Sequence, residues 1–462
     1  MPASALSLTV SCLSIGRPAL STDELATWSA VSRTLPQLVH LLTHVDAVLG
    51  LYYLALHAWC QLFGYSEVAL RTPSALAVAA TAGTTTMLGA RLADTRTGVL
   101  AGLLLAVLPA ATQVAQTARV YGVVMLLGCV SLHLLLCVTG PRRARRTTRL
   151  AYALSVILLG CLHLVACAAI LPVHLYLLIR HARRLRSSIL RTAGPLAVAI
   201  LALMPLVHVG YLQRHQLDWV DTIGFTGFVD TASRELVGSP SLVLLLGVLV
   251  GCGVAVAGRS RRVLAVWALA PITLLLATAI WVPRYAVLVV PAWTILAGRC
   301  AAELLRAPIP LAVLLASVTV AGIPRDESIR RPDGHGFDTR AAAVLIADHW
   351  RPGDGLIYRA DSWTTPLMMC YYQPGRAFST PLAYADAARV GWYTGTPRPP
   401  TYRNLGGATR LWYVRRGDHA AHPFDATGDS VAPATELARH YRVERSWLLP
   451  QTLTVLLLTP KP

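Results

Sequence analysis

The sequence has few charged residues and a single lysine, Lys461. Asp, Glu, Lys and Arg make up 14% of its 462 residues, whereas soluble domains carry about 25% charged residues. Hydrophobic residues reach 55%, and the mean hydropathy is +0.53. This composition excludes a disordered chain and argues strongly against a soluble enzyme.

Metal-binding and disulfide motifs are also missing. The nine cysteines include no CxxC pair, and their spacing does not suit zinc. Most of them stand inside apolar segments, and only Cys370 falls in the polar C-terminal part. The sequence therefore predicts neither a zinc site nor a disulfide framework.

Basic residues outnumber acidic residues, 41 to 23, and the net charge is +18. A nucleic-acid-binding protein gathers its arginines on one soluble face beside aromatic side chains. Here the arginines stand instead in short runs between apolar segments. We therefore expect membrane lipids, and no nucleic acid, as partners.

Long apolar segments are abundant. A helix needs about 20 apolar residues to cross a bilayer, or somewhat fewer where the bilayer thins. Eleven segments meet this requirement, at residues 3–17, 73–91, 98–115, 120–139, 150–164, 165–180, 193–211, 241–258, 264–282, 285–302 and 308–323. The sequence thus predicts a polytopic α-helical membrane protein with about 11 spans.

The arginine runs give these spans an orientation, because arginine-rich short loops tend to stay in the cytoplasm. If the eleven spans alternate, five runs fall on one side, namely Arg91 and Arg96; Arg142, Arg143, Arg145, Arg146 and Arg149; Arg180, Arg183, Arg184 and Arg186; Arg259, Arg261 and Arg262; and Arg299 and Arg306. The expected location is the plasma membrane, with a cytoplasmic N-terminus and an extracytoplasmic C-terminal part.

One further apolar segment, residues 46–64, has two interpretations. A twelfth span there would move every later arginine run to the outside. We therefore interpret it as an interfacial or re-entrant helix, where its Tyr52, Tyr53, His57, Trp59 and Gln61 suit the headgroup level. A twelfth span stays open as the alternative.

The composition becomes polar after residue 323. Helices are predicted over 338–350 and 434–441, and strands over 354–360, 409–416 and 452–460. This alternation predicts an extracytoplasmic α/β domain over 324–462. The remaining residues, 1–323, form a transmembrane module whose first outer loop is 17–72.

Two adjacent carboxylates, Asp23 and Glu24, follow the first span directly. Carboxylates at a membrane surface can take a proton from a substrate hydroxyl or bind a divalent cation. They are equally expected in the first turn of a helix capped by Ser21, Thr22 or Asp23. The sequence leaves catalytic, metal-binding and structural roles open, and a divalent metal ion stays open as a cofactor.

Two arginines stand at predicted outer ends of spans, where the cytoplasmic preference of arginine does not explain them. Arg119 and Tyr121 follow the third span, and Arg284 and Tyr285 follow the ninth. Such guanidinium groups pair with a buried acid or hold a phosphate. Snorkelling to lipid phosphates is the alternative.

Other polar residues are expected on the same side. His44, Asp46 and Tyr52 are candidates for substrate binding, and His163 lies at the outer turn between spans five and six. The loop 211–240 mixes aromatic and polar residues and is expected to lie over the pocket as a lid.

The order of several motifs resembles the GT-C glycosyltransferases, in particular bacterial members similar to protein O-mannosyltransferases and aminoarabinose transferases. The motifs also resemble an actinobacterial multispan group. They cover residues from about 10 to 360 and read GRPALSTDELATW, LYYLALHAWCQLFGYSEVALRTPSALA, AGLLLAVLPAATQVAQTARVYG, PRYAVLVVPAWTILAG and RPDGHGFDTRAAAVLIADHWRPGD.

This resemblance implies an active site on the first outer loop and a polyprenyl-phosphate sugar as donor. The acidic pair of the family falls on Asp23 and Glu24, and its arginine–tyrosine motifs fall on Arg119 with Tyr121 and on Arg284 with Tyr285. Thr117 stands where related sequences often have Glu. The AVLG stretch before Tyr52 also departs from the family, which leaves Asp46 as the nearby substitute for a second carboxylate.

The resulting hypothesis is the transfer of mannose or another hexose or pentose, by inversion, to a hydroxyl of a glycan, lipid or protein acceptor. Asp23 would take the acceptor proton, and Arg119 or Arg284 would stabilise the departing phosphate. Two alternatives stay open, a flippase for a lipid-linked glycan and an inactive scaffold for envelope assembly. A flippase is expected to show paired broken helices.

Overall fold

The computed structural model describes residues 2–140, 144–184, 189–220, 222–358, 362–381, 386–395, 405, 408–419, 424 and 437–462. These residues form two compact units. The first contains 1–15, 46–59 and 68–328, and the second contains 16–45, 60–67 and 329–462. Most of the predicted first outer loop therefore folds together with the C-terminal part of the chain.

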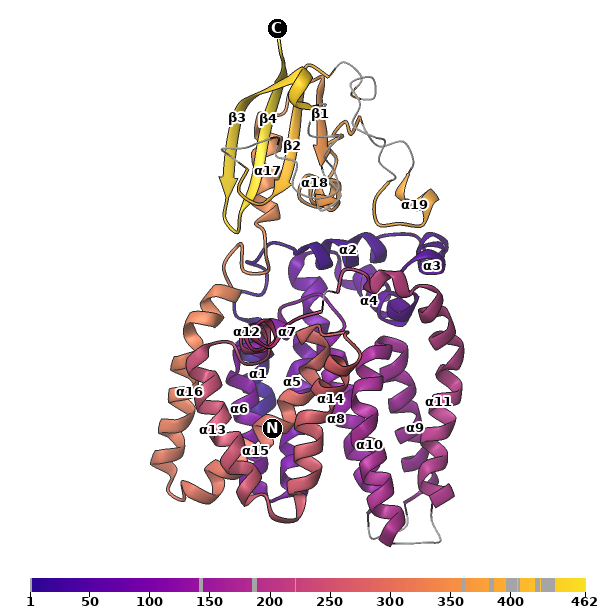
Figure 1. Cartoon of the computed structure of the whole chain (residues 1–462), viewed down its shortest axis with the longest axis vertical. Helices are drawn as coiled ribbons and strands as arrows, with labels where there is room; N and C mark the ends of the chain where they lie inside the picture. The colour runs from indigo at the N-terminus through magenta and orange to yellow at the C-terminus, as the bar shows by residue number, and fades with distance from the viewer. Residues whose placement is uncertain are drawn as a thin grey trace. The chain divides into compact units, whose positions relative to one another are not determined.

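The first unit is helical. Its long elements are α1 (Pro2–Cys12), α4 (Gly50–Phe63), α5 (Glu67–Leu92), α6 (Thr95–Val107), α7 (Pro109–Ala115), α8 (Tyr121–Val138), α9 (Arg146–Leu162), α10 (Leu164–Arg184), α11 (Ile189–Leu212), α12 (Phe225–Ala232), α13 (Pro240–Val256), α14 (Arg261–Ala277), α15 (Val290–Leu304) and α16 (Pro308–Ile329). Short turns join them, namely η1 (Ala47–Leu49), η2 (Arg214–Leu217), η3 (Ser233–Val237), η4 (Gly258–Ser260) and η5 (Pro283–Val289). Figure 1 shows these helices as a bundle.

All eleven predicted spans are helical over most of their length. Among the described residues, six helices are long and apolar enough to cross a membrane, and two bent pairs raise the number to eight. Of the other three, α1 has 11 residues, α9 has 17, and α5 has 26 but is less apolar, with five threonines among them. For these three, spanning the bilayer stays a prediction.

The segment 46–64 forms η1 and α4, a continuous apolar helix over Ala47–Phe63. Its 17 residues at 1.5 Å each give about 26 Å, which is shorter than the roughly 30 Å of the hydrocarbon layer. This length agrees with the interfacial interpretation, which stays a prediction.

Several predicted cytoplasmic loops meet at one end of the helix bundle. Arg91 donates to the carbonyl oxygen of Leu136, at the end of α8, over 2.9 Å. Arg299 in α15 pairs with Asp94 and Glu303, each at 2.8 Å. It also donates to the carbonyl oxygen of Val256. The alternation of spans thus brings arginine-containing loops together, while the side of the membrane that they face stays a prediction. Arg142, Arg143 and Arg186 lie outside the described residues.

Two helix pairs, each counted above as one broken span, are sharply bent. The bend between α6 and α7 is 63° and the bend between η3 and α13 is 85°. Pro109 begins α7, and Gly238, at φ +120°, follows η3. A proline cannot continue a helical ladder, and only glycine adopts that φ readily. A Cβ added at Gly238 would lie 2.8 Å from Cβ of Pro109, so the two breaks pack directly against each other.

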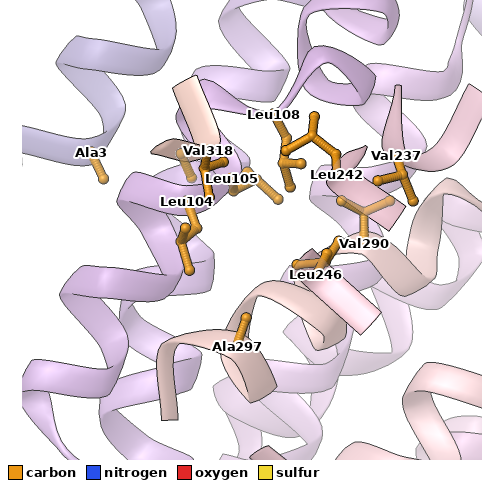
Figure 2. Close-up of a cluster of buried hydrophobic side chains, with 11 residues drawn as sticks. Ala3, Leu104, Leu105, Leu108, Val237, Leu242, Leu246, Val290, Ala297 and Val318 are labelled. Carbon is orange, nitrogen blue, oxygen red and sulfur yellow. The ribbon is translucent and has the colours of Figure 1, made fainter. Parts of the chain in front are cut away.

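A cluster of buried apolar side chains includes Leu108 and Val237, which precede the two breaks in the chain (Figure 2). Leu105 and Leu108 come from α6 and its end, Val237 from η3, Leu242 from α13 and Val318 from α16. In a bilayer the lipid is as apolar as these residues, so close packing holds such helices together. The cluster therefore fixes the positions at which the two broken spans turn.

The second unit contains a four-stranded mixed sheet in the order β1-β2-β4-β3. β1 is parallel to β2, and the other neighbours are antiparallel. Its elements are α2 (Thr22–Val31), α3 (Leu35–His44), α17 (Thr339–His349), β1 (Asp354–Tyr358), α18 (Thr365–Tyr372), α19 (Ala387–Val390), β2 (Arg410–Arg416), β3 (Tyr441–Leu449) and β4 (Leu453–Pro460). The α/β character predicted for the C-terminal part is confirmed.

Most of the predicted elements of this part form. The helix over 338–350 and the three predicted strands correspond to α17, β1, β2 and β4. Of the helix predicted over 434–441, residues 434–436 lie outside the described part and 437–440 are helical. The strand β3 and the helix α18 were not predicted from the sequence.

A buried ion pair joins β1 and β2 of this sheet. The fully buried carboxylate of Asp354 accepts from Arg410 Nη2 and Trp412 Nε1, each at 2.9 Å. Asp354→Asn leaves the Arg410 charge without its counter-ion, so we expect a loss of about 3 kcal/mol in the unfolding free energy of this unit.

Thermal unfolding of the purified protein in detergent, followed by tryptophan fluorescence, measures this effect. Asp348→Asn on the exposed side of α17 is the matched control and should change the midpoint little. Equal midpoints for the two variants would contradict the role of the ion pair.

Candidate active site

Arg119 lies in the turn between α7 and α8, and buried polar groups hold this turn in place. Ser74 Oγ of α5 donates to the carbonyl oxygen of Arg119 over 2.9 Å. The fully buried Gln116 donates to the carbonyl oxygens of Ser11 and Leu13, at 3.0 and 2.7 Å. These carbonyls end α1, so one turn is joined both to α5 and to the end of α1.

The Arg119 side chain begins a short chain of hydrogen bonds. Its Nη1 donates to the Tyr53 hydroxyl over 3.4 Å, and that hydroxyl donates to Asp46 Oδ2 over 2.7 Å. Asp46 has φ +54°, a left-handed conformation that aspartate tolerates better than most residues. Gln216 Oε1 accepts from the Asp46 backbone N–H, which fixes this conformation.

Arg284 meets the other end of the same turn. Its Nε donates to the Tyr121 hydroxyl over 3.1 Å, although the two residues are 163 positions apart. Its guanidinium also lies 5.6 Å from the centre of the Trp219 ring. Trp219 belongs to the loop predicted as a lid and is 57% exposed. A guanidinium held between a phenol and an indole keeps a fixed direction.

Aromatic rings connect the two arginines. The His163 ring lies 4.6 Å from the Tyr285 ring and 5.8 Å from the Tyr121 ring. The Tyr121 hydroxyl accepts from Arg284, and Tyr121 follows Arg119 by two positions, so these rings link the side chain of one arginine to the turn that carries the other. We call Asp46, Tyr53, Arg119, Tyr121, His163, Trp219, Arg284 and Tyr285 the arginine cluster.

The structure thus brings together six residues singled out in the sequence, namely Asp46, Arg119, Tyr121, His163, Arg284 and Tyr285. Another predicted residue, Tyr52, is buried with its ring 6.0 Å from that of Tyr53. The bridging role of Tyr53 was missed, because two adjacent tyrosines give no sequence sign of which one points to Arg119. Gln216 and Gln213 accept from the backbone N–H groups of Asp46 and Ala47. No sequence pattern pointed to these two glutamines.

Asp23, Glu24 and His44 belong to the second unit. Ser21 caps α2 through a capping box, in which Glu24 Oε2 accepts from the Ser21 backbone N–H over 3.0 Å. The same carboxylate, which is fully buried, contacts His335 Nδ1 at 3.2 Å. Glu24 therefore has the structural role that the capping alternative describes, while the half-buried Asp23 lies in the first turn of α2.

His44 ends α3 and is exposed. Its Nδ1 contacts the carbonyl oxygen of His40, one turn earlier, at 2.9 Å. Histidines near a helix end commonly bind the last carbonyl groups in this way. Its geometry supports a local cap, and substrate binding by His44 stays a prediction.

A metal ion does not fit the acidic pair well. Among the described residues, no group of three or more His, Cys, Asp or Glu side chains is arranged to hold a metal. Glu24 already accepts from Ser21 and contacts His335. Calcium and magnesium take six or more oxygen ligands, and we derive no step of the chemistry through a metal.

Asp46 offers a test of how the arginine cluster is built. Asp46→Asn keeps an acceptor for Tyr53 and tolerates the positive φ, whereas Asp46→Ala loses the acceptor and is strained there. We expect Asp46→Ala to lower the unfolding free energy by about 2 kcal/mol more than Asp46→Asn. Thermal unfolding in detergent measures the difference, and equal midpoints would show that this carboxylate does not support the cluster.

No family model matches the sequence, and no curated protein matches it. Among solved structures, the chain is similar to ArnT from Cupriavidus metallidurans in the apo state. The TM-score is 0.61 with 16% identity, over 98% of this chain and 96% of that chain.

Two further structures are similar. Arabinofuranosyltransferase AftD from Mycobacteria gives a TM-score of 0.54 with 17% identity, over 100% of this chain but only 39% of its own. An oligosaccharyltransferase from Archaeoglobus fulgidus in the apo form gives 0.52 with 10% identity, over 91% of this chain and 70% of its own. The predicted fold class is confirmed: the chain has the fold of the GT-C membrane glycosyltransferases.

Proposed function

We propose that this protein transfers a sugar from a polyprenyl-phosphate donor to an acceptor hydroxyl on the outer face of the plasma membrane. The observation that carries the proposal is the arginine cluster, in which Arg284 bonds to Tyr121 and Arg119 bonds to Tyr53, so that two arginines far apart in the chain are both held at the turn before α8. The fold likeness supports it, because one of the ArnT structures is described as bound to undecaprenyl phosphate.

The arginine cluster suits the phosphate of such a donor. Arginine presents planar N–H groups that match phosphate oxygens, and it stays charged at all physiological pH values. Tyr121 and Trp219 direct Arg284, and Tyr53 directs Arg119. Groups that are oriented in advance stabilise the charge that develops on a leaving phosphate without a further cost of reorganisation.

Asp23 is proposed as the general base. The acceptor oxygen forms a bond to the anomeric carbon while the bond from that carbon to the phosphate oxygen breaks. The proton of the acceptor hydroxyl passes to the Asp23 carboxylate, and the electron pair leaves with the polyprenyl phosphate. A single displacement of this kind inverts the anomeric carbon.

The same proposal includes an orientation of the chain in the membrane. In this proposal the arginine cluster faces the outside, the N-terminus is cytoplasmic and the C-terminal domain is extracytoplasmic. The proposed sugar is mannose or another hexose or pentose, and the acceptor is a glycan, lipid or protein hydroxyl.

The flippase alternative gains one observation, because two broken spans meet at Pro109 and Gly238. A flippase moves the lipid-linked sugar without breaking its bond to the phosphate. Release of free polyprenyl phosphate therefore separates the two functions, as it separates an enzyme from an inactive scaffold.

The base is tested with purified protein, polyprenyl-phosphate mannose and an acceptor glycan extract. We expect Asp23→Asn to lower the release of polyprenyl phosphate by about 100-fold or more, because general base catalysis supplies about 10²- to 10⁴-fold. If Asp23→Asn released polyprenyl phosphate at the wild-type rate, Asp23 would not be the base. If the wild-type protein released none with any sugar donor, the proposed enzyme activity would be refuted.

The phosphate site is tested with Arg119→Gln and Arg284→Gln in the same assay. Each variant should lower kcat by at least about 10-fold, because it removes a charge-assisted contact to the leaving group. Arg96→Gln is the matched control, since Arg96 donates to the carbonyl oxygen of Arg306 at the opposite end of the helices. Equal losses in all three variants would indicate general damage and contradict the phosphate site.

A further inference from the structure

The backbone that leads into α2 is held by side chains of the C-terminal part of the same unit. Arg340 of α17 donates to the carbonyl oxygen of Arg17 over 3.0 Å and to that of Gly16 over 3.2 Å. The Ala19 N–H donates to the carbonyl oxygen of Pro332 over 2.8 Å. Three residues of a loop that follows the first helix are thus bound by residues more than 300 positions later.

Leu20 is held on both sides of its peptide unit. Its N–H donates to the Tyr372 hydroxyl over 2.7 Å, and its carbonyl oxygen accepts from Thr339 Oγ1 over 2.8 Å. Leu20 is fully buried, so water does not compete for these groups. Burial raises the pKa of Tyr372 to about 12, which keeps the phenol neutral and able to accept the N–H.

The first turn of α2 is bound through side chains as well. Arg416 of β2 donates to Thr22 Oγ1 over 2.7 Å, and its guanidinium lies 5.1 Å from the Phe337 ring. His335 contacts the buried carboxylate of Glu24. Thr22 and Glu24 are the two neighbours of Asp23, so the residues on either side of the proposed base are both attached to the C-terminal part.

Arg340 is itself directed by two groups. Its Nη2 pairs with Glu67 Oε1 at 2.6 Å, and its guanidinium lies 5.5 Å from the Tyr372 ring. The planar guanidinium therefore binds two carbonyl oxygens and a carboxylate at once. Lysine cannot reproduce this geometry, because its ammonium is a single point of charge.

We propose that Arg340 and Tyr372 are positioning residues that place Asp23 for catalysis, and that the C-terminal domain is part of the catalytic machinery. The proposal rests on the proposed function, in which Asp23 is the base. A displacement of about 1 Å at a reacting group can lower a rate about 100-fold. A role in the positioning of Asp23 therefore predicts a loss in kcat that depends on the presence of the Asp23 carboxylate.

A double-mutant cycle tests this dependence. Arg340→Lys should lower kcat by about 10-fold or more, with an unchanged KM for the donor, because the arginine cluster keeps its residues. In the Asp23→Asn background, the same change should alter the residual rate by less than about 2-fold, since residues that act as a unit are not additive. Equal losses in both backgrounds would overturn the positioning role, even if Asp23 is the base.

Arg410→Lys is the matched control. Arg410 forms the buried ion pair with Asp354 in the same sheet and has no described contact with residues 16–24. A loss of kcat in Arg410→Lys as large as that in Arg340→Lys would show that general weakening of the domain is the cause, and the proposal would fail.

Hydrogen exchange supplies a readout that does not depend on activity. Tyr372→Phe removes the acceptor of the Leu20 N–H, so exchange in a peptide covering residues 16–24 should become at least about 10-fold faster. Arg410→Lys should leave that peptide unchanged. Unchanged exchange in Tyr372→Phe would show that Tyr372 does not hold residues 16–24 and would overturn the positioning role even if Asp23 is the base. Full activity of Asp23→Asn would instead overturn the proposed base, and the positioning role with it.

Discussion

The first unit depends on the need to hold guanidinium groups at the ends of membrane helices. A charge at that depth is costly unless it is paired or hydrogen-bonded. Arg119 is satisfied through Tyr53, which leads to Asp46, and Arg284 is satisfied through Tyr121 and the face of Trp219. These contacts join α4, the turn before α8, the loop before α12 and η5. Two positive charges are therefore presented in a fixed direction, which is the property that a phosphate-binding site requires.

The second unit follows from a different constraint, the burial of peptide groups in a segment without regular structure. Residues 16–20 form no strand or helix, so their N–H and C=O groups need other partners. Arg340, Thr339, Tyr372 and the Pro332 carbonyl supply them. This arrangement explains why a loop near the start of the chain and a domain at its end form one folded unit, and it places the proposed base on a rigid support.

Some residues of the candidate site were predicted from the sequence, and others were not. Arg119 and Arg284 were singled out because arginine is unexpected at the outer ends of spans. In the structure Arg119 bonds to Tyr53 and Arg284 bonds to Tyr121, while their role in a site stays a prediction. Glu24 was ambiguous, since an acid in a first turn suits a cap as well as a site. The contact with His335 was not visible, because no local pattern links residues 311 positions apart. Tyr53 was missed for the related reason that side-chain direction in a short helix depends on its neighbours.

The sequence by itself determined the membrane class, the helical segments and the α/β character of the C-terminal part. The length of an apolar segment and the alternation of apolar and polar residues are properties of neighbouring residues. They therefore favour a helix or a strand regardless of the rest of the chain. Only the tertiary structure decided that the two broken spans pack at Pro109 and Gly238, that Tyr53 links Arg119 to Asp46, and that residues 16–24 join the C-terminal domain. Each of these depends on hydrogen bonds or close contacts between residues distant in sequence, and the geometry of such contacts exists only after the chain has folded.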